Sequence, residues 1–113
     1  PLDRAGAPAP VQRAPRAELV VVQGDGAGTR FILDDGETIL GRVGGDATIA
    51  LNDPQISRRN AAISGANGVY TIRDLESLNG TIVNGRPLTQ PHRLAGGDAI
   101  MLGSTTLRFQ DRA

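Results

Sequence analysis

Residues 69–73 read Val-Tyr-Thr-Ile-Arg, and in this stretch Tyr70 and Ile72 alternate with smaller or more polar neighbours. Successive side chains of a β-strand point to opposite faces, so this order predicts a half-buried antiparallel strand. Residues 107–109, Leu-Arg-Phe, alternate in the same way. No stretch of useful length shows helical periodicity, and we therefore predict an all-β chain.

Short apolar runs rich in Val, Ile, Leu and Thr recur on both sides of this stretch, from Glu18 onward, about every ten residues. Turn residues that tolerate a positive φ stand between several of them, at 66–68, 79–80, 84–85 and 103–104. The pattern is typical of a sandwich or barrel, and with only three aromatic residues the core must rely on aliphatic packing. The predicted strands are residues 19–23, 30–33, 38–40, 48–50, 60–64, 69–73, 82–83, 99–102 and 105–109.

The length of 113 residues fits one domain. Residues 1–17 contain four of the seven prolines among alanine and glycine, and we predict a flexible linker there, followed by a domain over residues 18–113. The first residue is Pro1 and not methionine, so we expect the chain to be a piece of a longer protein or a processed product.

Charge and composition exclude several classes of partner. Twelve basic residues, all arginine, balance twelve acidic ones, so no net charge draws the chain to nucleic acid or to an anionic membrane. The chain has no cysteine, which removes disulfides, thiolate metal sites and cysteine nucleophiles. It also has neither a bilayer-spanning apolar run nor a secretory apolar region. We expect a soluble, cytoplasmic protein with no cofactor, no metal ion, and neither nucleic acid nor membrane as partner.

One stretch has glycines like those of a nucleotide-binding loop. Gly24, Gly26 and Gly28 follow a predicted strand, but a Rossmann fingerprint needs its third glycine one position later, where Thr29 stands, and a helix after it. The next residues, RFILDD, have the pattern of a strand, and the chain has no lysine for a P-loop. We interpret the segment as a flexible β-hairpin loop.

Candidate catalytic groups are sparse. The single histidine, His92, has no serine or carboxylate at a triad or metal-ligand spacing, and we interpret it as a solvated loop residue. Asp34 and Asp35 stand in Asp-Asp-Gly-Glu-Thr, which has the pattern of a turn before a strand. We therefore predict that this chain is not an enzyme.

Three further stretches, taken in order, resemble one known family. They are Ile-Leu-Gly-Arg at 39–42, Ile-Ser-Arg-Arg-Asn-Ala at 56–61 and Ser-Leu-Asn-Gly-Thr-Ile-Val-Asn-Gly at 77–85. Their order and spacing are similar to those of the forkhead-associated (FHA) domain, whose pattern runs Gly-Arg, then Ser-x-x-His, then Asn-Gly-Thr and Val-Asn-Gly. The resemblance covers residues 18–110. It implies a two-sheet β-sandwich of the FHA/SMAD type with about eleven short strands, whose loops at one end bind phosphothreonine peptides.

The resemblance also implies which residues bind phosphate. Phosphothreonine carries about −1.5 to −2 charges and three acceptor oxygens, so its site must supply several donors. Arg42 matches the family arginine whose guanidinium binds the phosphate, and Ser57 matches the serine whose hydroxyl donates to it. Arg58 matches a position that commonly adds a backbone or side-chain donor. Without the resemblance, Arg42 would be a surface arginine at a strand end and Ser57 a turn serine that bonds its own backbone.

Further matches concern the peptide backbone and the shape of the loops. Asn79 matches the asparagine that hydrogen-bonds the peptide backbone beside the phosphothreonine, and it is also the first residue of an Asn-Gly turn. Leu78 stands where family members carry Ser or Thr, so a hydroxyl contact is lost while a backbone contact can persist. The residues expected to shape the loops are Gly41, Gly80, Thr81, Asn84 and Gly85.

The main departure from the family pattern is Asn60, which replaces its histidine. That histidine braces the serine loop against the neighbouring loop and does not bind phosphate. Asparagine offers an amide donor and a carbonyl acceptor on a shorter arm, so we expect a looser brace. We expect Arg59 to pack its stem along the sheet. The neutral Gln55, near a position that can select a flanking peptide residue in the family, argues against a strict requirement for acidic peptides.

Two functions remain open at this point. The first is a phosphothreonine-dependent binding module in Ser/Thr-kinase signalling, part of a larger protein, with a phosphothreonine-containing protein or peptide, a Ser/Thr kinase or its substrate as partner. The alternative is a degenerate FHA-like domain for phospho-independent protein contact or self-association, and Asn60 and Leu78 motivate it.

Overall fold

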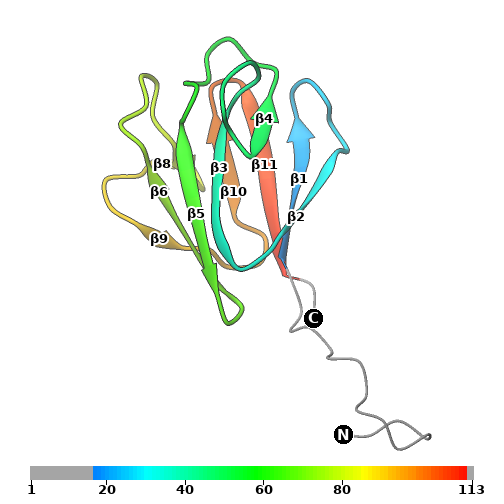
Figure 1. The fold of residues 1–113 in the computed structure, drawn as a ribbon, viewed down its shortest axis with the longest axis vertical. Coiled ribbons are helices and arrows are strands. Elements are labelled where there is room, and N and C mark those ends of the chain that lie inside the picture. The colour runs from blue at the N-terminus through cyan, green and yellow to red at the C-terminus, as the bar shows by residue number, and fades with distance from the viewer. Residues whose placement is uncertain (1–16, 112–113) are drawn as a thin grey trace, which may run out of the picture.

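The computed structural model describes residues 17–111, which form a β-sandwich (Figure 1). Six strands form one sheet in the order β2-β1-β11-β10-β7-β8, and five form the other in the order β4-β3-β5-β6-β9. Eleven strands in two sheets, without a helix among the described residues, confirm the predicted all-β sandwich. The strands are β1 (Ala17–Gln23), β2 (Arg30–Leu33), β3 (Gly36–Arg42), β4 (Ile49–Leu51), β5 (Ala61–Ala66), β6 (Val69–Asp74), β7 (Ile82–Val83), β8 (Arg86–Pro87), β9 (His92–Arg93), β10 (Ala99–Leu102) and β11 (Thr105–Asp111).

One strand pair, β3 and β4, is parallel, and it places the loops that matter below. Arg42, the last residue of β3, lies beside Leu51, the last residue of β4. Parallel strands end at the same edge of a sheet, so the chain leaves both strands at one end of the sandwich. The loop of residues 52–60 therefore begins next to Arg42 before the chain returns in β5.

The core between the sheets is mainly aliphatic, as the small number of aromatic residues predicted. In the β5–β6 pair, Ile63 lies opposite Ile72, and both side chains are buried. The stretch Val69–Asp74 thus forms the strand that its alternation predicts, with Tyr70 and Ile72 facing the core. Tyr70 also packs against Phe109 of β11, with ring centroids 5.7 Å apart, so one aromatic contact joins the two sheets.

Most of the predicted turns form hairpins. Asn67 and Gly68 have φ of 55° and 80°, and Asn84 and Gly85 have 52° and 80°, the left-handed values that a two-residue hairpin turn requires. At 79–80 the prediction of a hairpin turn is wrong. Only Gly80 has a positive φ there, and the segment lies in the longer loop between β6 and β7.

The prediction missed the two-residue strands β8 and β9. His92, interpreted as a solvated loop residue, lies in β9 opposite Ile72, and its ring contacts Asp98 at 3.0 Å. Strands this short show no alternation, and β8 (Arg86–Pro87) and β9 (His92–Arg93) also lack the β-branched residues of the equally short β7 (Ile82–Val83), which the sequence did predict. At the N-terminus, β1 begins at Ala17, the last residue of the predicted linker, and residues 1–16 lie outside the described part of the chain, as do 112–113.

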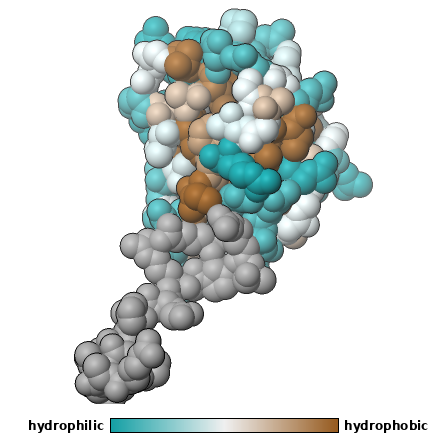
Figure 2. Space-filling model, turned by 90° about the vertical axis from the view of Figure 1, so that its right-hand side faces the viewer, coloured by the Kyte–Doolittle hydropathy of each residue, from teal (hydrophilic) through white to brown (hydrophobic). Residues whose placement is uncertain are grey.

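The surface on the β1–β2 side carries hydrophobic groups in small patches separated by hydrophilic ones (Figure 2). Across the described surface the exposed large hydrophobic residues include Val22, Ile32 and Met101 of the six-stranded sheet. No helix within residues 17–111 could cross a membrane.

Candidate functional site

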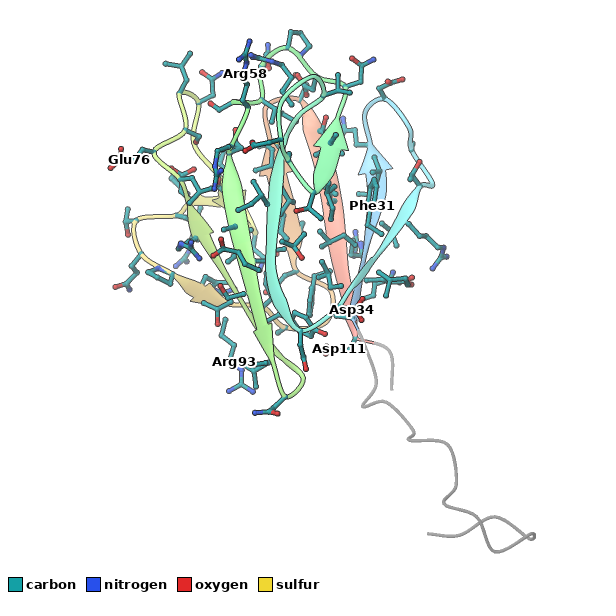
Figure 3. The ribbon with its side chains drawn as sticks, in the orientation of Figure 1. Phe31, Asp34, Arg58, Glu76, Arg93 and Asp111 are labelled. Atoms are coloured by element: carbon teal, nitrogen blue, oxygen red, sulfur yellow. The ribbon has the colours of Figure 1, made fainter. Side chains whose placement is uncertain are left out.

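Most of the residues singled out by the sequence gather at the end of the sandwich where β3 and β4 terminate. Figure 3 shows Arg58 at this end, far from Asp111 at the other. We call it the recognition end, and define it by the loop between β4 and β5 (residues 52–60) and the loop between β6 and β7 (residues 75–81).

Arg42 is half-buried at the last position of β3 and joins the strand to the first of these loops. Its backbone N–H donates to the Ser57 carbonyl at 3.0 Å, and one guanidinium nitrogen, Nη1, donates to the Ile56 carbonyl at 3.2 Å. The other guanidinium N–H groups have no partner within residues 17–111 and can bind an anion.

Gly41 is required by a close approach of two backbones. A Cβ atom at this position would lie 1.8 Å from the Arg58 carbonyl oxygen. The φ of Gly41 is not in the left-handed region, so the requirement is for space alone. The absence of a side chain lets the Ser57–Arg58 segment lie directly against β3.

Ser57 is held so that its hydroxyl proton stays available. The backbone N–H of Leu78 donates to Ser57 Oγ at 3.0 Å, which makes the oxygen an acceptor and leaves the O–H to donate elsewhere. The N–H of Leu78 is therefore committed within the protein, while its side chain is 89% exposed. The backbone contact to a peptide that the resemblance implied for Leu78 cannot use this N–H while it bonds Ser57.

Asn60 is completely buried and connects the two loops. Its carbonyl oxygen Oδ1 accepts the N–H of Ser57 at 3.0 Å. Its amide nitrogen Nδ2 donates to the Gly80 carbonyl at 3.2 Å and to Thr81 Oγ1 at 3.1 Å. Asn60 therefore connects the serine loop to the neighbouring loop. Although its side chain is shorter than that of histidine, both the carbonyl oxygen and the amide nitrogen of its side chain form hydrogen bonds.

Asp74, at the end of β6, anchors the second loop. It accepts the backbone N–H of Ser77 at 3.0 Å, the Ser77 hydroxyl at 2.6 Å and the Thr81 hydroxyl at 2.7 Å. Burial alone would raise the pKa of the Asp74 carboxyl, but the hydrogen bonds from Ser77 and Thr81 outweigh it and hold that pKa below its ordinary value. Asp74 is therefore ionised at neutral pH.

Asn79 links the second loop back to the first. Its amide Nδ2 donates to the Gln55 carbonyl at 2.8 Å, and its carbonyl oxygen has no partner within the described residues.

Asp53 holds the base of the first loop, where its carboxylate accepts the N–H groups of Gln55 and Ser104 and the Thr105 hydroxyl. Burial alone would raise the pKa of Asp53, but these three bonds outweigh it and lower the pKa.

Arg58 and Arg59 follow Ser57, and only Arg59 forms an ion pair. Arg58 is exposed, and its guanidinium has no hydrogen bond or ion pair with any residue between 17 and 111. Arg59 does not pack along the sheet as predicted, because its side chain is 54% exposed and pairs with Asp46 at 3.2 Å. A pair this exposed contributes little to stability.

Asn84 and Gly85 are not brought to the recognition end. Asn84 donates to Asp98 at 2.9 Å and accepts the Ala99 N–H at 2.9 Å, which fixes the β7–β8 hairpin against the start of β10. Asp98 also accepts the N–H of Ala95 and contacts His92. Burial alone would raise the pKa of Asp98, but these bonds outweigh it and lower the pKa.

The recognition end thus offers several hydrogen-bond donors that have no partner within the described residues. Free guanidinium N–H groups of Arg42, the Ser57 hydroxyl and Arg58 are uncommitted, whereas every buried side-chain polar atom of the described residues has a hydrogen-bond partner. Within residues 17–111 no group of three His, Asp or Glu side chains could hold a metal ion. The arrangement suits the binding of an anion by charge-assisted hydrogen bonds.

A family model for the FHA domain matches residues 38–103, which is more than half of the chain and includes both loops of the recognition end. The chain belongs to the FHA domain family. The resemblance in the sequence is thereby confirmed, and the sandwich is the FHA fold.

This FHA domain is similar in sequence to a named bacterial regulator. The glycogen accumulation regulator GarA of Mycobacterium tuberculosis is 42% identical over 93 residues, which cover 82% of this chain and 56% of GarA. The chain thus spans little more than half the length of that relative.

Solved FHA structures match closely in shape. One, from a structural and functional analysis of phosphothreonine-dependent FHA domain interactions, is 38% identical with a TM-score of 0.76 and covers 84% of this chain and 95% of that one. Another, the FhaA FHA domain complexed with the intracellular domain of Rv3910, is 38% identical with a TM-score of 0.75 and covers 83% and 99%.

Sequence reasoning missed the two anchoring carboxylates, Asp74 and Asp53. Each stands where a strand gives way to a loop, and each accepts an N–H two or three residues further along the chain. This local pattern of Asp followed by a turn is a known signal for side-chain-to-backbone bonds. Their longer contacts, to Thr81 and Thr105, could not be read from the sequence.

Proposed function

We propose that this FHA domain binds peptides that carry phosphothreonine. The observation that carries the proposal is the cluster of uncommitted donors at the recognition end: the free guanidinium N–H groups of Arg42, the Ser57 hydroxyl and the exposed Arg58. A phosphate with about −1.5 to −2 charges and three acceptor oxygens satisfies such a set. Asn79 stands beside it with a free carbonyl oxygen for the peptide backbone.

The wider role follows from the family and from the relatives. We infer that the domain is a non-enzymatic part of a larger protein and that its partner is a phosphorylated protein in Ser/Thr-kinase signalling, either the kinase or its substrate. In support, the similar GarA is named a regulator, and a similar solved structure comes from a study of phosphothreonine-dependent interactions. We also propose that the domain acts in the cytoplasm, together with the kinase and its substrate.

A titration of one phosphothreonine peptide and its unphosphorylated twin tests the proposal. Each charge-assisted hydrogen bond contributes about 1.5–3 kcal/mol, so Arg42→Ala should weaken binding of the phosphopeptide at least about tenfold. Arg108→Ala is the matched control, because Arg108 is an exposed arginine of β11 in the other sheet. Equal affinities for the two peptides, or normal binding by Arg42→Ala, would contradict the proposal.

One observation favours the alternative of phospho-independent contact. The Leu78 side chain is 89% exposed at the recognition end, where an apolar contact would bury it. A protein partner retained after phosphatase treatment, and lost on Leu78→Ser, would support that function.

A further inference from the structure

Two hydrogen-bond paths lead from the Asp74 carboxylate to Ser57. In the first, the Thr81 hydroxyl donates to Asp74 at 2.7 Å, Asn60 Nδ2 donates to Thr81 at 3.1 Å, and the Ser57 N–H donates to Asn60 at 3.0 Å. In the second, Asp74 binds the hydroxyl and N–H of Ser77, and the next residue, Leu78, donates its N–H to Ser57 Oγ. One path ends on the backbone of Ser57 and the other on its side chain.

The charge of Asp74 sets the direction of the first path. A carboxylate only accepts hydrogen bonds, so the Thr81 hydroxyl must donate to it and must therefore accept from its other neighbour. That neighbour is the Asn60 amide nitrogen, which turns the Asn60 carbonyl oxygen toward the Ser57 N–H. The Gly80 carbonyl, which accepts from the same amide nitrogen, supports this orientation.

The burial of Thr81 and Asn60 prevents water from replacing their hydrogen-bond partners in this network. Thr81 is 1% exposed and Asn60 is completely buried, whereas Ser57 at the recognition end is only half-buried. A polar group buried in this way must find its partner within the protein, because an unsatisfied one costs about 1–3 kcal/mol. The network is therefore rigid behind Ser57 and open in front of it.

We propose that Asp74 is a positioning residue for phosphopeptide binding, which acts on Ser57 through Thr81 and Asn60 and through Ser77 and Leu78. It does not touch the ligand. It fixes the serine loop and directs the Ser57 hydroxyl proton outward, so that binding need not order this loop. The inference rests on the proposed function, and it names the carboxylate that orients Asn60, the residue that stands in place of the family histidine.

The test is Asp74→Asn, which keeps the shape of the side chain. Asp74 uses both oxygens: Oδ1 accepts the two hydroxyls and Oδ2 accepts the Ser77 N–H. Asparagine offers one acceptor oxygen, so either the Ser77 N–H or the hydroxyls of Ser77 and Thr81 meet an N–H donor instead. We expect the phosphopeptide Kd to rise about tenfold and the Ser57 amide to exchange its hydrogen about tenfold faster, the ratio expected for one lost hydrogen bond.

The matched control is Asp98→Asn. Asp98 also accepts three groups from its surroundings and also has a lowered pKa, but it lies at the opposite end of the sandwich. We expect a comparable fall in the free energy of unfolding with no change in phosphopeptide Kd or Ser57 exchange. If Asp98→Asn changed both to the same extent as Asp74→Asn, general softening would explain the result and the inference would be overturned.

A second pair of variants serves if Asp74→Asn does not fold. Thr81→Val removes the hydroxyl that connects Asp74 to Asn60, and Thr81→Ser restores it. Faster Ser57 exchange and weaker phosphopeptide binding in the valine variant, with recovery in the serine variant, is the expected result. Unchanged Ser57 exchange in Thr81→Val or Asp74→Asn overturns the inference.

The two measurements separate this inference from the proposed function. If the unmodified chain binds the phosphopeptide and its unphosphorylated twin equally, the proposed function fails. The exchange of the Ser57 amide still reports whether Asp74 holds the serine loop. If phosphopeptide binding is selective but Asp74→Asn leaves Kd unchanged, the positioning role fails and the proposed function stands.

Discussion

At each end of the sandwich an aspartate carboxylate holds a loop by hydrogen bonds. The two ends differ in the donors that remain without a partner. At the recognition end Asp74 gathers Ser77 and Thr81, and at the opposite end Asp98 gathers Ala95, Asn84 and His92. Both carboxylates have a lowered pKa because hydrogen bonds outweigh the cost of burial.

The difference lies in the groups in front of each carboxylate. At the recognition end the Ser57 hydroxyl and the guanidinium groups of Arg42 and Arg58 retain N–H or O–H donors that have no partner within residues 17–111. At the opposite end the Asn84 amide and the His92 ring are used internally. Bracing a loop is therefore common to both ends, and the uncommitted donors that lie together in front of the brace make the recognition end suitable for an anion.

The largest expected effect comes from cutting the brace between the two loops. Asn60→Ala removes three hydrogen bonds from a completely buried site and leaves their partners unsatisfied, so we expect the free energy of unfolding to fall by about 2–4 kcal/mol. Denaturant unfolding measures it, and phosphopeptide affinity should also fall.

Asn84→Gly is the control at the opposite end. It removes the two side-chain bonds of Asn84 and tolerates the positive φ at this position. Stability should fall less than in Asn60→Ala, and phosphopeptide affinity should not change. Weaker phosphopeptide binding in Asn84→Gly would show that the two ends are not independent.

The next effect comes from closing the space between β3 and the serine loop. Gly41→Ala would place a Cβ 1.8 Å from the Arg58 carbonyl oxygen, so the Ser57–Arg58 segment must move. We expect a loss of about 1–3 kcal/mol in stability, as for other overpacked sites, together with weaker phosphopeptide binding. Gly96→Ala is the control, because its Cβ would meet only Asp111, whose Oδ2 is the nearest atom at 3.3 Å. Equal phosphopeptide affinity in both variants would contradict the prediction.

Acid should weaken both ends of the sandwich. A carboxylate whose pKa is lower in the folded state contributes stability that is fully present above its unfolded pKa of about 3.9 and is lost as the pH falls through the folded value. Asp53, Asp74 and Asp98 all have lowered pKa values. We therefore expect the free energy of unfolding to be constant near neutrality and to decline below about pH 4.

Denaturant titrations between pH 7 and pH 2.5 measure this decline. Asp74→Asn and Asp98→Asn should each make the acid limb shallower, since each removes one of the carboxylates responsible. A decline centred near pH 6 would show that other groups control the acid stability, and the absence of any decline down to pH 2.5 would contradict the contribution of these carboxylates.

The smallest expected effect concerns phosphopeptide binding near neutral pH. The brace is an asparagine, which does not titrate, so between pH 6 and pH 8 the affinity should follow the second ionisation of the ligand phosphate, with a pKa of about 6. We expect about a twofold gain from pH 6 to pH 8, nearly all of it below pH 7.5. A steep change above pH 7.5 in a calorimetric titration would point to a titrating group in the protein.

The sequence was sufficient for the long elements because their information is local. Alternation predicted β6 and β11, and the Asn-Gly pairs at 67–68 and 84–85 predicted two hairpin turns with positive φ. It failed for β8 and β9, which have two residues each and exist only because a neighbouring strand pairs with them. It also failed for Arg59, whose partner Asp46 belongs to a different loop.

By itself, the sequence determined the sandwich, the family, and the order in which Arg42, Ser57 and Asn79 occur along the chain. Strand periodicity and short motifs are properties of neighbouring residues, so they can be recognised from the sequence without knowledge of the fold. Only the tertiary structure decided how the Ser57 loop is held, because Asp74, Asn60 and Thr81 meet across separations of up to 21 residues. A buried hydrogen-bond network depends on which groups the fold brings within about 3 Å of each other, and no local pattern encodes that.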